Sequence, residues 1–210
     1  MIFYTADMHF GNESIIAKTD RPFATVEEMD EQLIANWNAV VSPEDTVYIL
    51  GDVGLNHGPI PAEYVARLNG HKHLIRGNHD TGLDRQEEWF DYVESVTDFL
   101  EIDDGEIHVT LCHYPIVYIQ RGYMIHGHLH NTRKDTYEIM KQLHRVLNAG
   151  VDINHFRPVT LQELIENNRE FYEDPERGLL NYLHSGKFRM PPGWKADFRP
   201  LPLRPMDRDA

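Results

Sequence analysis

The pattern that decides the fold is clearest at residues 46–52, which read Thr46-Val47-Tyr48-Ile49-Leu50-Gly51-Asp52. This stretch joins β-branched and aromatic residues, which favour a strand, to a glycine and a carboxylate, which favour a turn. The same plan recurs at residues 2–6, 73–76, 107–112 and 123–125, where strand candidates end in Asp, Asn or His. Because the carboxyl ends of neighbouring parallel strands meet, the pattern predicts one crowded site at one edge of a sheet.

Helix candidates lie between these runs and follow capping signals. Thr25-Val26-Glu27-Glu28 reads as a capping box, and apolar residues continue at helical spacing as far as Val41. A shorter helix is expected over residues 61–69, ended by Gly70, and a second capping box at residues 160–163 opens a helix to about Arg169. Strands that alternate with helices predict a mixed fold, which we assign as α/β (α+β).

The composition is that of an acidic globular protein. The chain has 210 residues, of which 41% are hydrophobic and 26% charged, enough for one large domain or one domain with an appendage. Its single cysteine, Cys112, excludes an intramolecular disulfide and argues against a cysteine-ligated zinc or iron–sulfur site. The formal net charge of −14 argues against a general nucleic-acid binder. An enzyme that handles phosphate would need a local reversal of this charge.

No stretch of the sequence reads as a membrane or export segment. The first residues lead straight into a strand and an aspartate, without the basic and apolar regions of a signal peptide. The longest run free of Asp, Glu, Lys and Arg, residues 107–120, has 14 residues and is too short and polar to cross a bilayer. We therefore expect a soluble, cytoplasmic protein without a membrane partner.

The C-terminal part differs from the body of the chain. Half of the 12 prolines follow residue 170, and the residues from Ser185 onward include six basic and three acidic side chains. We predict a domain over residues 1–172 and a proline-rich, basic extension over residues 173–210. The extension is expected to fold over the mouth of the site, to contact another subunit or to lie along its own surface. The oligomeric state stays open.

The polar residues at the strand ends offer carboxylate, amide and imidazole groups but no thiolate. This mixture suits divalent manganese, which we expect, with iron, zinc, nickel or magnesium as alternatives. The number of ligands exceeds one tetrahedral site and fits two metals about 3.5–4 Å apart, with positions left open for water and substrate. The candidate ligands are Asp7, His9, Asp52, Asn78, His113, His128 and His130.

Taken in order, the motifs at these positions form a specific set. They are Asp7-x-His9, Gly51-Asp52, Gly77-Asn78-His79-Asp80, His113 and Gly127-His128-x-His130. The set covers residues 7–130 and resembles the calcineurin-like metallophosphoesterases, while residues 21–23 and 148–152 are similar to short bacterial and phage-type members. The resemblance implies a two-sheet β-sandwich flanked by helices, and a hydrolase of phosphate esters that uses two divalent metal ions.

The resemblance also implies a role for each residue. One metal would be held by Asp7, His9, Asp52 and His130, and the other by Asp52, Asn78, His113 and His128. Asp52 would thus bridge the two ions. His79 would stabilise or protonate the leaving group, oriented by Asp80, while a metal-bridging hydroxide attacks phosphorus. Two divalent ions would leave the site net positive within an acidic protein.

The identity of the substrate and two rival functions stay open. Asn78, His126 and Arg21 are candidate substrate contacts, and Asp152 is a candidate for orienting a metal-bound histidine. A small phosphodiester or phosphomonoester is expected as substrate, with a nucleotide-like one favoured. The alternatives are a metal-dependent nuclease on DNA or RNA, against which the acidic charge argues, and a non-catalytic binding module, against which His79 argues.

Overall fold

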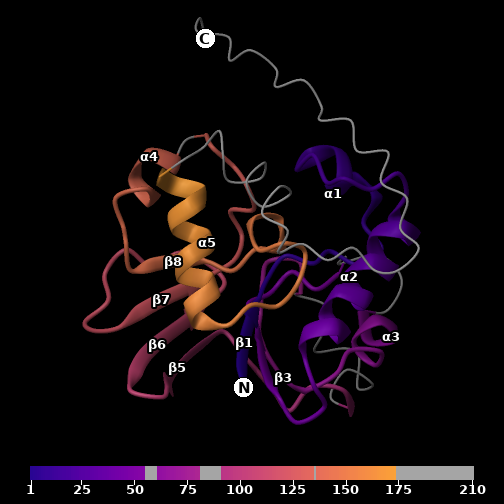
Figure 1. The fold of residues 1–210 in the computed structure, drawn as a ribbon, viewed down its shortest axis with the longest axis horizontal. Helices are drawn as coiled ribbons and strands as arrows, with labels where there is room; N and C mark the ends of the chain where they lie inside the picture. The colour runs from indigo at the N-terminus through magenta and orange to yellow at the C-terminus, as the bar shows by residue number, and fades with distance from the viewer. Residues whose placement is uncertain (55–60, 81–90, 135, 174–210) are drawn as a thin grey trace, which may run out of the picture.

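The structure, a computed structural model, describes residues 1–54, 61–80, 91–134 and 136–173. These residues form two four-stranded sheets with helices on their outer sides (Figure 1). The first sheet is parallel, in the order β1-β2-β3-β4, with strands Ile2–Thr5, Thr46–Ile49, His71–Ile75 and Ser95–Thr97. The second sheet, in the order β5-β6-β7-β8, has strands Phe99–Asp104, Ile107–Cys112, Tyr123–His126 and Val146–Asn148. The predicted two-sheet fold is confirmed.

The two sheets pack against each other through one shared apolar layer. Tyr4 and Ile75 of the first sheet are buried in the same cluster as Val109, Leu111 and Ile125 of the second. The β5–β6 pair is antiparallel, whereas β6, β7 and β8 run parallel to one another. As a result, β1, β2 and β3 of one sheet and β6 and β7 of the other deliver their carboxyl ends to a common region.

Helices cover the outer sides of both sheets (Figure 1). On the first sheet, α1 (Glu13–Lys18), α2 (Val26–Val40) and α3 (Pro61–Val65) contribute side chains to one apolar cluster with β1, β2 and β3. Beside the second sheet, α4 (Tyr137–Met140) and α5 (Leu161–Glu173) do the same, and α5 contacts β8 and β1. A short 3-10 helix, η3 (Val151–Ile153), follows β8.

Both predicted capping boxes form, but two of the helices end at other residues than predicted. The Thr25 hydroxyl accepts the Glu28 N–H at 3.2 Å, and the Thr160 N–H donates to the Glu163 carboxylate at 3.0 Å. The predicted helix over residues 61–69 ends earlier, at Val65, because the next turn tightens into hydrogen bonds three residues apart. In contrast, α5 continues past Arg169 to Glu173.

The expected site at one edge of a sheet needs a correction. Strands β4, β5 and β8 were not among the predicted ones, and β5 to β8 form a second sheet. The first sheet aligns its strand ends, since Thr5 lies opposite Ile49 and Ile49 opposite Leu74. The candidate ligands therefore come from two sheets whose ends meet, instead of from one sheet.

The predicted C-terminal extension falls almost wholly outside the described residues. Of residues 173–210, the structure describes Glu173, which is the last residue of α5. The predicted domain boundary thus falls within the last turn of a helix. Among the helices that the structure describes, none has the length and apolar character needed to cross a membrane.

Candidate metal centre

The candidate ligands sit on the loops that leave the strands, in strained backbone. Asp7, His9, Asp52, His128 and His130 all have positive φ angles, between 51° and 70°. A non-glycine residue in this left-handed region costs about 1–3 kcal/mol and persists only when its surroundings enforce it. Here they do, because the Asp7 and His9 N–H groups donate to the Gly51 and Asp52 carbonyl oxygens at 3.0 Å. Such strain is concentrated at functional sites more often than elsewhere.

One group of ligands consists of Asp7, His9 and His130, and we call it the first position. Their ligand atoms all lie within 4.8 Å of one another, and all three residues are buried. Both ring nitrogens of His9 are buried without a hydrogen-bond partner among the described residues. Burial is the main cause that lowers the pKa of His9 to about 2, so its imidazole is neutral and keeps a free lone pair. A bound cation would satisfy this nitrogen.

A second group consists of Asp52, His113 and His128, and we call it the second position; its ligand atoms also lie within 4.8 Å of one another. The His113 Nδ1–H donates to the Leu50 carbonyl oxygen at 2.7 Å, which orients the ring and leaves Nε2 as its candidate ligand atom. That Nε2 lies 3.1 Å from the Asn78 Oδ1. An imidazole nitrogen and an amide oxygen are both groups that can coordinate a divalent ion.

Asn78 belongs with the second position, and Asp52 lies between the two positions. The Asn78 Oδ1 is also 2.9 Å from the His128 Nδ1, which places this amide among the ligands of the second position. The Asp52 Oδ2 lies 3.7 Å from the His9 Nε2 and 3.5 Å from the His113 Nε2. One carboxylate oxygen therefore stands between the first and second positions, where a bridging ligand would stand.

The electrostatics of the first position favour a cation. Burial raises the pKa of Asp7 to about 6, although the neighbouring His130 and His113 act against this. Burial alone would lower the pKa of His130, but its hydrogen bond to Asp152 and the charge of Asp7 outweigh burial and raise it. A buried carboxylate among imidazoles is costly to ionise without a counter-charge, and a divalent ion supplies that charge.

The side chains of His79 and Asp80, which were predicted to act together, have different surroundings in the structure. The His79 ring is partly buried and stands edge-on to the His9 ring, with centroids 5.1 Å apart. Asp80 does not orient this ring as predicted, because its carboxylate accepts the backbone N–H groups of Asp52 and Gly77, each at 2.7 Å, and of Val53 at 3.1 Å. Asp80 instead holds the loop that carries Asp52.

Two of the predicted substrate contacts lie away from any open surface. Arg21 is buried, and its guanidinium binds the Asp152 carboxylate, so the structure corrects the expectation that it touches a phosphate. The reason is that a buried arginine needs a paired carboxylate, and Asp152 supplies it. His126 is also fully buried, and its Nδ1 lies 2.6 Å from the Gly127 carbonyl oxygen. Asp152 lies 2.8 Å from the His130 Nδ1, which is the orienting contact predicted for it.

Two residues near the centre were missed by the sequence analysis. The Asn148 amide donates to the His130 carbonyl oxygen at 2.7 Å and accepts the Gly150 N–H at 2.8 Å, so it supports the strained loop after β7. The exposed Tyr114 ring lies 4.8 Å from the His128 ring, at the edge of the second position. Tyr114 directly follows the candidate ligand His113, and this adjacency is the sequence feature that could have indicated its position.

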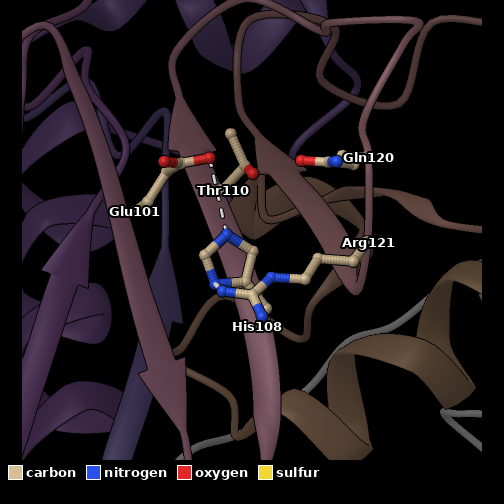
Figure 2. A pocket seen from close by; sticks show the side chains of 5 residues that line it. All are labelled: Glu101, His108, Thr110, Gln120 and Arg121. Carbon is tan, nitrogen blue, oxygen red and sulfur yellow. Dashed lines mark hydrogen bonds and ion pairs between the residues drawn. The ribbon is translucent and has the colours of Figure 1, made fainter.

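The structure also has a cavity that is separate from the ligands. It measures about 420 Å³ and lies over β5 and β6 (Figure 2). Its lining side chains are Glu101, His108, Thr110, Gln120 and Arg121, and none of them belongs to the first or second position. The His108 Nε2 lies 3.4 Å from the Glu101 carboxylate. This cavity therefore does not mark the metal centre.

Comparison with known proteins adds a family and several relatives. A family model described as calcineurin-like phosphoesterase matches residues 1–189. An uncharacterised protein of Methanocaldococcus jannaschii is 34% identical over 168 residues, which cover 79% of this chain and 89% of that protein. The gene 66 protein of Mycobacterium phage D29 is 27% identical over 208 residues, which cover 85% of this chain and 98% of the phage protein. A solved structure of a protein of unknown function from Aquifex aeolicus has a TM-score of 0.63 and 26% identity, and covers 79% of this chain and 98% of its own.

Proposed function

Since the chain belongs to the calcineurin-like phosphoesterase family, we propose that it hydrolyses a phosphate ester with two divalent metal ions held where its two sheets meet. The observation that carries the proposal is the pair of ligand groups with Asp52 between them. The buried, unpartnered nitrogens of His9 support it further, because they fit a cation and no other group in the described part of the chain satisfies them.

The residues around the centre have distinct roles in this proposal. Asp7, His9 and His130 would hold one ion and Asn78, His113 and His128 the other, with Asp52 shared. When bound, two divalent ions would polarise water as a nucleophile and neutralise the charge of the phosphate oxygens. His79 belongs to neither group and is partly exposed, so its imidazole is available to donate a proton to the departing alkoxide.

For the substrate we propose a small, soluble phosphodiester or phosphomonoester, with a nucleotide-like molecule favoured and manganese as the metal. The net charge of −14 disfavours DNA and RNA, whose backbones would be repelled by the bulk surface. The charge of the ions would act locally and over a short range, which suits a ligand small enough to enter the centre. We place this activity in the cytoplasm.

The direct test is hydrolysis of nitrophenyl phosphate and bis-nitrophenyl phosphate by metal-stripped protein resupplied with Mn²⁺, Ni²⁺, Zn²⁺ or Mg²⁺. We expect a metal-dependent rate that is lost in Asp52→Asn, because this change weakens a ligand shared by both positions. The matched control is Asp103→Asn, the same chemical change at an exposed residue of β5, which should keep the wild-type rate.

The outcomes separate the proposal from its rivals. The better of the two substrates decides between a phosphodiesterase and a phosphatase. Faster hydrolysis of single-stranded or duplex nucleic acid than of either small ester would instead identify a nuclease. Protein that binds two ions per chain yet hydrolyses none of these substrates would contradict the hydrolase and support a binding module.

A further inference from the structure

A buried ion pair stands directly behind the first position. The Arg21 Nε donates to the Asp152 Oδ1 at 2.8 Å, and its Nη2 lies 3.2 Å from the Asp152 Oδ2. The two side chains are almost wholly enclosed, with 0% and 1% of their surfaces exposed. The same Asp152 Oδ2 accepts the Nδ1–H of His130 at 2.8 Å. This contact fixes the ring so that the opposite nitrogen, Nε2, carries the lone pair.

The guanidinium also reaches the other side of the first position. Its Nη2 donates to the Asp7 carbonyl oxygen at 2.7 Å, and its Nη1 donates to the Met8 carbonyl oxygen at 2.8 Å. These carbonyl groups belong to the strained turn after β1, in which Asp7 has a φ of 58°. One arginine therefore ties the loop of Asp7 to the residue that orients His130, although Arg21 and Asp152 are 131 positions apart in sequence.

The second position is supported in another way. Its His113 is oriented by a backbone group, the Leu50 carbonyl oxygen, at 2.7 Å. Its Asp52 carboxylate accepts one backbone N–H, that of His79, at 2.8 Å. Within the described part of the chain, the hydrogen bonds and ion pairs of Arg21 and Asp152 do not involve Asp52, His113 or His128. The side chains and carbonyl groups that orient the ligands therefore differ between the two positions, although the Asp7 carboxylate also accepts the His128 N–H.

We propose that Arg21 and Asp152 are positioning residues that build the first metal position, and that the second position forms without them. This inference rests on the proposed function, since it takes the two ligand groups to be metal sites. Only arginine meets the requirement at residue 21, because it donates to a carboxylate and to two carbonyl groups at once. The ion pair adds no net charge behind the centre, so it orients His130 without opposing or attracting the metal as a free charge would.

The test measures Mn²⁺ binding to the full chain instead of turnover. Wild-type protein is expected to bind two ions, seen by equilibrium dialysis and as a coupled pair in electron paramagnetic resonance. In Asp152→Ala, the affinity of one ion should fall by about 10- to 100-fold, which is typical for loss of a group that orients a ligand. The spectrum should then show single, uncoupled Mn²⁺ while the other ion binds as before.

Double variants identify which ion is lost. His128→Ala removes a ligand of the second position, so its combination with Asp152→Ala should weaken both ions. His9→Ala removes a ligand of the first position. Because Asp152→Ala affects the same position, the double variant should bind the same number of ions as either single variant. The opposite pattern, in which Asp152→Ala adds to His9→Ala but not to His128→Ala, would overturn the proposal.

Two further variants keep the test decisive if an unpaired buried arginine prevents folding. The pair Arg21→Met with Asp152→Ala removes both charges together, and the same selective loss is expected. Arg21→Lys keeps a charge but cannot form all of the contacts, so its first-position affinity should lie between those of wild type and Asp152→Ala.

A core variant separates positioning from general destabilisation. Leu33 is a buried residue of α2 that belongs to neither ligand group, so Leu33→Ala, which leaves a cavity in the core, should leave both Mn²⁺ affinities unchanged. Equal weakening of both positions in Asp152→Ala, or no weakening of either, would refute the inference while wild type still binds two ions. Failure of the wild-type protein itself to bind Mn²⁺ or any other divalent ion would instead refute the proposed function.

Discussion

His79 differs from the other histidines of the centre because its imidazole belongs to neither ligand group. Its backbone N–H donates to the Asp52 carboxylate at 2.8 Å, so the main chain at this residue supports the centre whatever the side chain is. The ring itself stands beside His9 and is partly exposed. At the scale of single residues, the contacts of His79 are thus divided: its backbone N–H supports a candidate ligand, and its imidazole lies outside both ligand groups.

This division predicts the behaviour of His79→Ala. Turnover should fall by roughly 10²-fold or more, because the proton donor for the leaving group is lost. Metal content, measured by elemental analysis, should stay at the wild-type level. His9→Ala is the matched control, since it removes a neighbouring imidazole that is a ligand and should reduce metal content. Purification of His79→Ala without metal would show that the imidazole has a role in binding.

At the scale of elements, α2 does more than cover the first sheet. Its Asp30 is buried and accepts the Gly11 N–H with both carboxylate oxygens, at 3.0 and 3.2 Å. This contact fixes the loop that follows His9, so the helix and the metal centre are mechanically connected. Burial raises the pKa of Asp30 from 3.8 to about 6, even though the Gly11 N–H favours the charged form.

The raised pKa of Asp30 predicts a pH-dependent stability. Below about pH 4 the group is protonated in both the folded and the unfolded chain. Between pH 4 and 6 the unfolded chain releases this proton first, so the folded state loses stability as the pH rises. In urea unfolding of metal-free protein, Asp30→Asn should therefore gain stability relative to wild type across this interval, and keep a constant difference above it.

A second acid on the same helix provides the control for this measurement. Glu31 is exposed and pairs with Arg67, whose hydrogen bond lowers the pKa of Glu31. Glu31→Gln should therefore show a small trend of the opposite sign, with stability lost relative to wild type as the pH rises. A stability difference between Asp30→Asn and wild type that does not change with pH would contradict the assigned cause.

At the scale of the whole molecule, the metal centre joins the two sheets. Asp7 and Asp52 follow strands of the first sheet, whereas His113, His128 and His130 follow strands of the second. The Asp7 carboxylate also accepts the His128 N–H, at 2.9 and 3.0 Å, across the same junction. Ions bound here would be held by both sheets of the folded chain and by neither sheet alone.

Metal binding should therefore stabilise the entire fold. For an ion at 100 times its Kd, the expected gain in free energy of unfolding is about 2.7 kcal/mol for each position. Thermal unfolding of metal-stripped protein with and without Mn²⁺ measures this as a rise in Tm. The rise should be much smaller in Asp52→Asn, and an equal rise in this variant and in wild type would place the stabilising ion elsewhere.

The sequence by itself determined which side chains could hold metal ions, because the candidate ligands follow strand ends within short, ordered motifs. Capping boxes at Thr25 and Thr160 likewise placed two helices, since capping depends on residues three positions apart. Strands β4 and β8 were not predicted because three residues carry too little pattern. Strand β5 was not predicted because its exposed residues, Phe99, Glu101 and Asp103, mix an apolar with two acidic side chains.

Only the tertiary structure decided how these parts come together. It assigned Arg21 to Asp152 instead of to a phosphate, and Asp80 to backbone N–H groups instead of to His79. The physical reason is that a buried charge is satisfied by whichever partner packing brings near, and packing joins residues that are 131 positions apart. The candidate ligands are local signals in the sequence, whereas the partners that orient their side chains and loops are set by the fold.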